Sequence, residues 1–168
     1  MAYFNADPIL GVQPIDQSST VQNHPLGMIV RGKDPVDGNG EFIYLLGVTG
    51  TAVGNLVNWS GSATGTASWQ TAISGSAASQ GVSLAVAMSA NTGSAYGWYA
   101  IGGAVMVTTN GTFAATGRIY LASSGNVTTT SAAGTEILNI NQVTATGTPA
   151  ANQAKVYINR PFAQGQII

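Results

Sequence analysis

The chain has 168 residues, of which 7% are Asp, Glu, Lys or Arg, and its formal net charge is −1. A chain of this length predicts one domain with a core large enough to be stable without covalent staples. Cysteine is absent, which excludes disulfides, thiolate metal sites and thiol nucleophiles. The five Lys and Arg residues are scattered, whereas nucleic acid is bound by a stripe of basic side chains. We therefore expect no nucleic-acid partner.

The most informative stretch runs from Phe42 to Gly117, where 76 residues contain no Asp, Glu, Lys, Arg or His. An average soluble protein has roughly 25% charged residues. Active sites usually need a positioned acid, base, nucleophile or metal ligand, so we expect a non-enzymatic protein without cofactor or metal. A surface with so little charge gives weak repulsion between copies, which predicts that other copies or a partner cover much of it.

Residues 1–41 differ from the rest because they hold five of the six acidic residues and four of the six prolines. Closely spaced prolines exclude a long helix, so this part is predicted to be an extended arm that leads into a β domain at residues 42–168. Its apolar residues have two interpretations: they pack on their own domain, or they reach a neighbouring subunit. These residues are Phe4, Ile9, Leu10, Val12 and Ile15.

The first residues lack the basic and apolar regions of a signal peptide, which predicts a product made in the cytoplasm. Gly, Ser, Thr and Asn interrupt every apolar run, so no membrane-spanning helix and no membrane partner are expected.

After residue 41 the chain consists of short runs rich in Val, Ile, Thr, Tyr and Trp, which are bounded by Gly, Asn and Ser. Ser124-Gly125-Asn126 is a hairpin signal between two such runs. The spacing predicts an all-β fold, namely an antiparallel sandwich or barrel of jelly-roll-like type. The predicted strands are Glu41–Val48, Asn55–Ser60, Ala67–Ser74, Val82–Ser89, Tyr96–Ile101, Ala104–Thr109, Thr112–Ala115, Arg118–Ala122, Asn126–Thr130, Glu136–Asn141 and Ala154–Asn159.

Few residues offer chemistry. The single histidine, His24, has no nucleophile elbow near it, so we interpret it as a solvated or locally hydrogen-bonded side chain. The segment Asp34–Glu41 has oxygen ligands at short spacing, but the spacing departs from a calcium loop and predicts a turn into the first core strand. Trp59, Trp69 and Trp98 are candidate sugar-stacking platforms, although packing is the more common role of tryptophan.

Several segments together resemble small capsid-associated proteins of tailed bacteriophages, the decoration or cement proteins. The segments are Val86-Ala-Met-Ser89, Ser94-Ala-Tyr-Gly-Trp-Tyr-Ala-Ile-Gly-Gly-Ala-Val-Met-Val107, Gly117-Arg-Ile-Tyr-Leu-Ala122 and Val156-Tyr-Ile-Asn-Arg-Pro-Phe162. The resemblance implies an all-β protein bound in many copies to the outside of an icosahedral head, where it bridges major capsid protein subunits as trimers or dimers.

From these observations we expect a virion protein of the head exterior, with a homotrimer favoured and a dimer possible. The alternative is a carbohydrate- or receptor-binding β module of a phage fibre or spike. The apolar terminus Ile167–Ile168 hints at a further contact. The residues predicted to contact the capsid or another subunit are Phe4, Ile9, Leu10, Val12, Ile15, Pro161 and Phe162.

Overall fold

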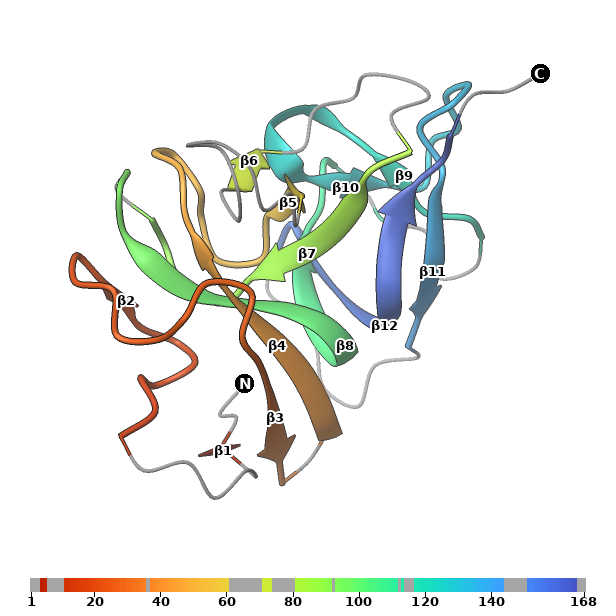
Figure 1. Cartoon of the computed structure of the whole chain (residues 1–168). Coiled ribbons are helices and arrows are strands. Elements are labelled where there is room, and N and C mark those ends of the chain that lie inside the picture. The colour runs from red at the N-terminus through yellow and green to blue at the C-terminus, as the bar shows by residue number, and fades with distance from the viewer. Residues whose placement is uncertain are drawn as a thin grey trace.

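The protein is described by a computed structural model in which β-strands dominate (Figure 1). In the part that the structure describes, the helical element is one short 3-10 turn, η1 (Ser123–Gly125). For residues 4–5 and 71–73 only the backbone is described. The described residues are 4–5, 11–35, 37–60, 71–73, 81–91, 93–111, 113, 117–143 and 151–165.

The strands form one large antiparallel sheet and a separate ribbon of β9 and β10. Along the main path the order is β1-β3-β4-β8-β12-β7-β5-β6, while β11 adds to β12 and β2 adds to β8. This confirms the predicted all-β, antiparallel fold, which is consistent with a sandwich. The strands are β1 (Phe4–Asn5), β2 (Ser18–Ser19), β3 (Ile29–Asp34), β4 (Gly38–Leu46), β5 (Leu56–Trp59), β6 (Thr71–Ile73), β7 (Ser83–Ala87), β8 (Tyr96–Thr108), β9 (Tyr120–Leu121), β10 (Val127–Thr128), β11 (Ile137–Gln142) and β12 (Gln153–Ala163).

The hairpin signal at Ser124-Gly125-Asn126 is confirmed, because β9 and β10 pair with Val127 opposite Leu121. Ser124 and Gly125 both have positive φ, of 60° and 74°, as a tight connection between antiparallel strands requires.

The central strand β8 is a single strand where the sequence predicted two, Tyr96–Ile101 and Ala104–Thr109. Its first half pairs with β4, and its second half, from Gly102 onward, pairs with β12. The glycine pair Gly102–Gly103, which lies between the two predicted strands, is a bend within this one strand. Glycine permits the bend because Gly103 has a φ of 103°, which residues with a side chain rarely adopt.

Two groups of buried side chains form the core. The main core lies between the large sheet and the β9–β10 ribbon; it contains Phe42, Tyr44 and Trp98 together with Val105, Val107, Ile119, Leu121 and Val127. A second cluster is formed by the side chains on the other face of β4, β5, β7 and β8. Its buried residues include Ile43, Leu45, Tyr99 and Ile101, and Trp59 packs against it. The sheet is therefore apolar on both faces over these strands, which explains why their sequences are continuously hydrophobic.

Residues 11–35 lie against the same unit. Ile15 is 5% exposed and belongs to the main core, Val12 packs against that core, and β3 extends the sheet beyond β4 with Val30 fully buried. For Val12 and Ile15 the structure thus shows packing on their own chain, one of the two interpretations that the sequence left open.

Gln13 attaches this segment to the sheet through both its backbone and its side chain. Its carbonyl oxygen accepts from Trp98 Nε1 at 2.9 Å, and its Oε1 accepts from the Tyr44 hydroxyl at 3.1 Å and from Asn23 Nδ2 at 2.9 Å. Its backbone N–H donates to His24 Nε2 at 3.0 Å. A buried amide with this many partners fixes the path of the chain, because each lost partner would leave a desolvated polar group.

Burial raises the pKa of the Tyr44 hydroxyl above its usual value; the backbone N–H of Asn23 acts in the opposite direction, and nearby Tyr96 raises the pKa further. The unfolded chain therefore loses this proton first as the pH rises, at about pH 10. We expect Tyr44 to contribute stability that is complete below pH 10 and is lost as the pH rises above it. Urea unfolding between pH 8 and 11 tests this: the stability of wild type should fall toward that of Tyr44→Phe, whose own curve lacks this component. A constant difference between the two proteins would contradict the assignment.

Candidate interaction surface on β3, β4 and β12

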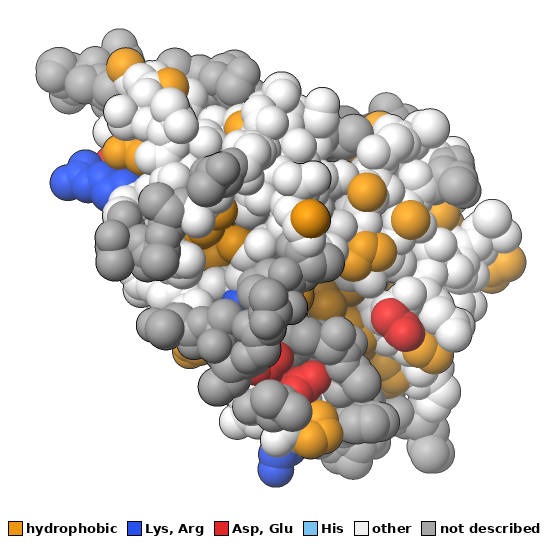
Figure 2. Space-filling model, turned by 180° about the vertical axis from the view of Figure 1, so that it is seen from behind, with side chains coloured by type: hydrophobic (Ala, Val, Ile, Leu, Met, Phe, Trp, Pro, Cys, Tyr) orange, Lys and Arg blue, Asp and Glu red, His pale blue; other side chains and the backbone are white. Residues whose placement is uncertain are grey.

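Most of the few charged residues of the chain belong to one hairpin and one further strand. Seven of its eleven Lys, Arg, Asp and Glu residues belong to the β3–β4 hairpin or to β12, and together they have a net charge of +1. On the face seen in Figure 2, uncharged atoms cover most of the described surface and charged side chains lie at a few separate places. The seven residues are Arg31, Lys33, Asp34, Asp37, Glu41, Lys155 and Arg160.

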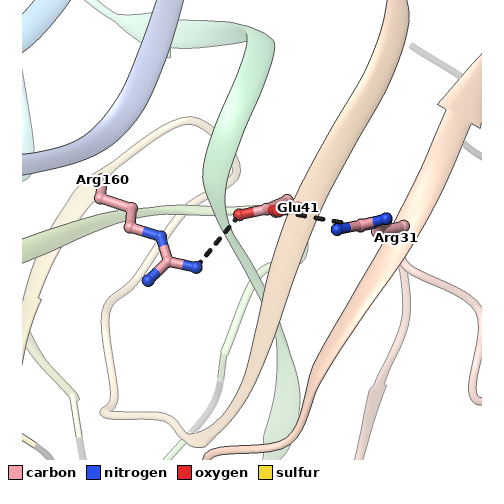
Figure 3. A network of polar contacts seen from close by, with 3 residues as sticks. All are labelled: Arg31, Glu41 and Arg160. Carbon is pink, nitrogen blue, oxygen red and sulfur yellow. Dashed lines mark hydrogen bonds and ion pairs between the residues drawn. The ribbon is translucent and has the colours of Figure 1, made fainter.

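Three of these residues form an ion-pair cluster in which Glu41 lies between two arginines (Figure 3). Arg31 Nε is 3.8 Å from Glu41 Oε1, and Arg160 Nη2 is 3.5 Å from Glu41 Oε2. The arginine side chains are 73% and 66% exposed, so each pair contributes at most about 1 kcal/mol to folding. Two guanidinium groups thus approach the two oxygens of one carboxylate at the surface.

A polar hollow of about 340 Å³ opens beside this cluster. The strand register explains its position, because Arg31, Glu41, Gly102 and Asn159 are cross-strand neighbours in one row over β3, β4, β8 and β12. Gly102 has no side chain to fill the row, and Gly40 and Gly103 also line the hollow, so backbone forms part of its floor. Asn39, Tyr157, Ile158 and Asn159 complete the lining.

A second hollow, here called the apolar slot, adjoins the same cluster. It has a volume of about 190 Å³ and is lined by Ile29, Trp59, Ile101 and Pro161 together with Ser83, Leu84 and Arg160. The two hollows meet at the ion pairs, because Arg160 lines the slot whereas Glu41 and Arg31 line the polar hollow. Apolar and polar recognition elements are thus adjacent on one surface.

Exposed apolar side chains also concentrate here. Of the five large hydrophobic residues exposed in the described part of the chain, three belong to β3 or β12: Ile29 at 45%, Tyr157 at 51% and Phe162 at 37%. Phe162 is paired through the ladder with Ser83, which lines the apolar slot. Two of the sequence-predicted contact residues, Pro161 and Phe162, are therefore at or next to this surface.

The remaining predicted contact residues are placed as follows. Val12 and Ile15 pack in their own chain, as described above. The backbone of Phe4 belongs to β1 and pairs with Lys33 of β3. The side chain of Phe4 and residues Ile9, Leu10, Ile167 and Ile168 lie outside the described part.

The segment Asp34–Glu41, which was considered as a calcium loop, contains the turn between β3 and β4 and the first residues of β4, so the predicted turn is confirmed. The backbone N–H of Asp37 donates to Asp34 Oδ1 at 2.9 Å. The carboxylate of Asp37 accepts a hydrogen bond from Lys155 Nζ of β12, and both side chains are only 8% exposed. This buried ion pair ties the hairpin turn to β12 and so holds together the strands that form the polar hollow.

The described tryptophan and histidine candidates make packing contacts or hydrogen bonds within the fold. Trp98 is fully buried, which confirms packing as its role and excludes it as a sugar platform. Trp59 packs against the second cluster, with its Nε1 3.4 Å from the Leu84 carbonyl oxygen, and Trp69 lies outside the described residues. The His24 ring contacts Tyr44 and Trp98 at centroid distances of 5.1 and 5.4 Å. Since its Nε2 already accepts from Gln13, His24 acts here as a locally hydrogen-bonded residue.

Within the described ranges, no group of three or more His, Asp or Glu side chains could hold a metal ion. No helix in those ranges is long and apolar enough to cross a membrane. Comparison with protein-family models, with curated proteins and with solved structures found no match to this chain. Its function must therefore be argued from the surface itself.

Proposed function

We propose that this chain is a structural virion protein that decorates and cements the outside of a tailed-phage icosahedral head. The observation that supports this proposal best is the apolar slot with Pro161 in its wall, next to exposed Ile29 and Phe162. Apolar side chains that remain exposed around a hollow are typical of a surface that binds a protein partner. The resemblance of Val156–Phe162 to decoration proteins falls on this same strand.

The partner in this proposal is the major capsid protein, and the decoration protein acts as an oligomer, with a trimer favoured and a dimer as the alternative. A low-charge exterior suits this role because copies and shell can approach it without strong like-charge repulsion. When one subunit of an oligomer is bound, the remaining contacts become intramolecular, so the avidity can exceed single-site affinity by about 10² to 10⁴. Modest contacts at each slot are then sufficient for cementing.

The proposal is tested by co-sedimentation of the purified protein with empty heads assembled from the major capsid protein of the same genome. Wild type should sediment with the heads. The double variant Ile29→Ser/Phe162→Ser should bind at least about tenfold more weakly, because apolar contact area is lost in the slot at Ile29 and beside it at Phe162. Mass measurement in solution should show a multiple of the 17.0 kDa chain.

The matched control is Val21→Ser, since Val21 is 65% exposed but belongs to neither β3 nor β12 and does not line the slot. This variant should bind heads as wild type does. The proposal fails if wild type does not sediment with the heads, or if the double variant binds as tightly as Val21→Ser.

A further inference from the structure

The polar hollow brings exposed polar and aromatic side chains together beside the Arg31–Glu41 ion pair. Tyr157 is 51% exposed at its edge, Asn39 and Asn159 are exposed amides, and Glu41 and Arg31 lie along one wall. We propose that this hollow binds one ring of a neutral sugar. The inference does not depend on the proposed role at the phage head.

The chemistry of the walls selects this class of ligand. A simple anion would face the Glu41 carboxylate, a simple cation would face Arg31, and an apolar ligand would leave the amides of Asn39 and Asn159 desolvated. A neutral sugar avoids all three costs because each hydroxyl both donates and accepts hydrogen bonds. It donates to Glu41 and accepts from Arg31, while the amides can do either.

Tyr157, at the edge of the hollow, supplies an aromatic ring on which a sugar can stack. The C–H face of a sugar ring is apolar and stacks on an exposed aromatic ring, while its hydroxyl groups reach polar side chains around the ring. In the hollow these two kinds of group come from different strands, with Tyr157 and Asn159 on β12 and Asn39 and Glu41 on β4. The glycine floor between them allows a sugar ring to approach the backbone closely.

The volume of about 340 Å³ is at the lower end of the range of small-ligand pockets, which suits one ring and not a long chain. A ligand of that size in an open site binds weakly, with a Kd of about 1 mM. If several copies are arrayed on one particle, as in the proposed function, multivalent attachment to a glycan-coated surface would be much stronger than this.

The experiment is an amide NMR titration of the intact protein with glucose, galactose, mannose and N-acetylglucosamine, each to about 50 mM so that a Kd of about 1 mM is saturated. We expect at least one of these sugars to shift the amide signals of Gly40, Gly102 and Gly103 in the floor of the hollow. Tyr157→Ala should weaken that binding by at least about tenfold. Gly102→Leu should also abolish it by filling the hollow, since a Cβ at Gly102 meets only ordinary contacts, the nearest at 3.4 Å to Glu41 Cβ.

Phe162→Ala is the matched control, because this exposed aromatic residue is on the same strand but does not line the hollow. It should leave sugar binding unchanged while weakening binding to heads, and Tyr157→Ala should show the reverse pattern. The inference is overturned if none of the four sugars shifts these glycine signals, or if a folded Tyr157→Ala protein binds sugar as wild type does. Either result leaves the head-binding measurement, and thus the proposed function, independently testable.

Discussion

Replacing Gly103 with alanine is expected to lower the free energy of unfolding by about 4 kcal/mol, a large share of the 5 to 15 kcal/mol typical of a domain. Two costs combine at this position. The φ of Gly103 is 103°, where a side chain strains the backbone by about 1 to 3 kcal/mol. A Cβ there would also lie 2.6 Å from the Asn39 carbonyl oxygen and 2.8 Å from Gly40 Cα. Both are backbone atoms of β4, so the sheet itself would have to move.

Urea unfolding measures this effect, and Gly38→Ala separates its two components. Gly38 has a φ of 82° but nothing within 4 Å of the position of a Cβ, so its substitution costs only the backbone strain of about 1 to 2 kcal/mol. Equal destabilisation by the two substitutions would show that β4 and β8 are not in close contact at the bend. The close approach would then not be what shapes the floor of the hollow.

The strands that were predicted well from the sequence are those whose hydrophobic pattern is contained in a few consecutive residues. Val82–Ser89 was predicted as a strand and β7 spans Ser83–Ala87; Ala154–Asn159 was predicted and lies within β12, Gln153–Ala163. Alternating or continuously apolar runs with β-branched residues specify such strands without knowledge of their partners.

Strand β3 was missed because the prolines around it were interpreted as features of an extended arm. Pro25 and Pro35 flank Ile29–Asp34 and do not interrupt it, so the strand keeps all its backbone donors. The alternation in Ile29-Val-Arg-Gly-Lys-Asp34, followed by a turn with Asp37-Gly38, was the available signal. With it, Arg31 opposite Glu41 could have been predicted from the hairpin register.

The rest of the candidate surface could not be predicted from local pattern. Arg160 reaches Glu41, and Tyr157 lines the same hollow, only because β8 pairs at Gly102 with both β4 and β12. Pairing between strands so distant in the sequence depends on the whole topology, which one sequence does not specify. Arg31 and Arg160 therefore looked scattered along the chain, although the fold brings both of them to Glu41.

Replacing Lys155 with methionine is expected to lower the free energy of unfolding by about 3 to 5 kcal/mol, because the Asp37 carboxylate would stay buried without its counter-charge. Methionine keeps most of the volume of the lysine stem, so the loss measures the charge and not a cavity. Urea unfolding at pH 7 gives the value. The double variant Asp37→Asn/Lys155→Met should recover most of the loss, since no unpaired charge remains.

Arg118→Met is the matched comparison, because Arg118 forms an ion pair with Glu136 at 2.9 Å but its side chain is 72% exposed. That substitution should change the stability by less than about 1 kcal/mol. If Lys155→Met is no more harmful than Arg118→Met, the Asp37–Lys155 pair does not hold the hairpin turn to β12. The polar hollow would then depend on the Gly102–Gly103 bend alone, and sugar titration of a folded Asp37→Asn/Lys155→Met protein would give the same Kd as wild type.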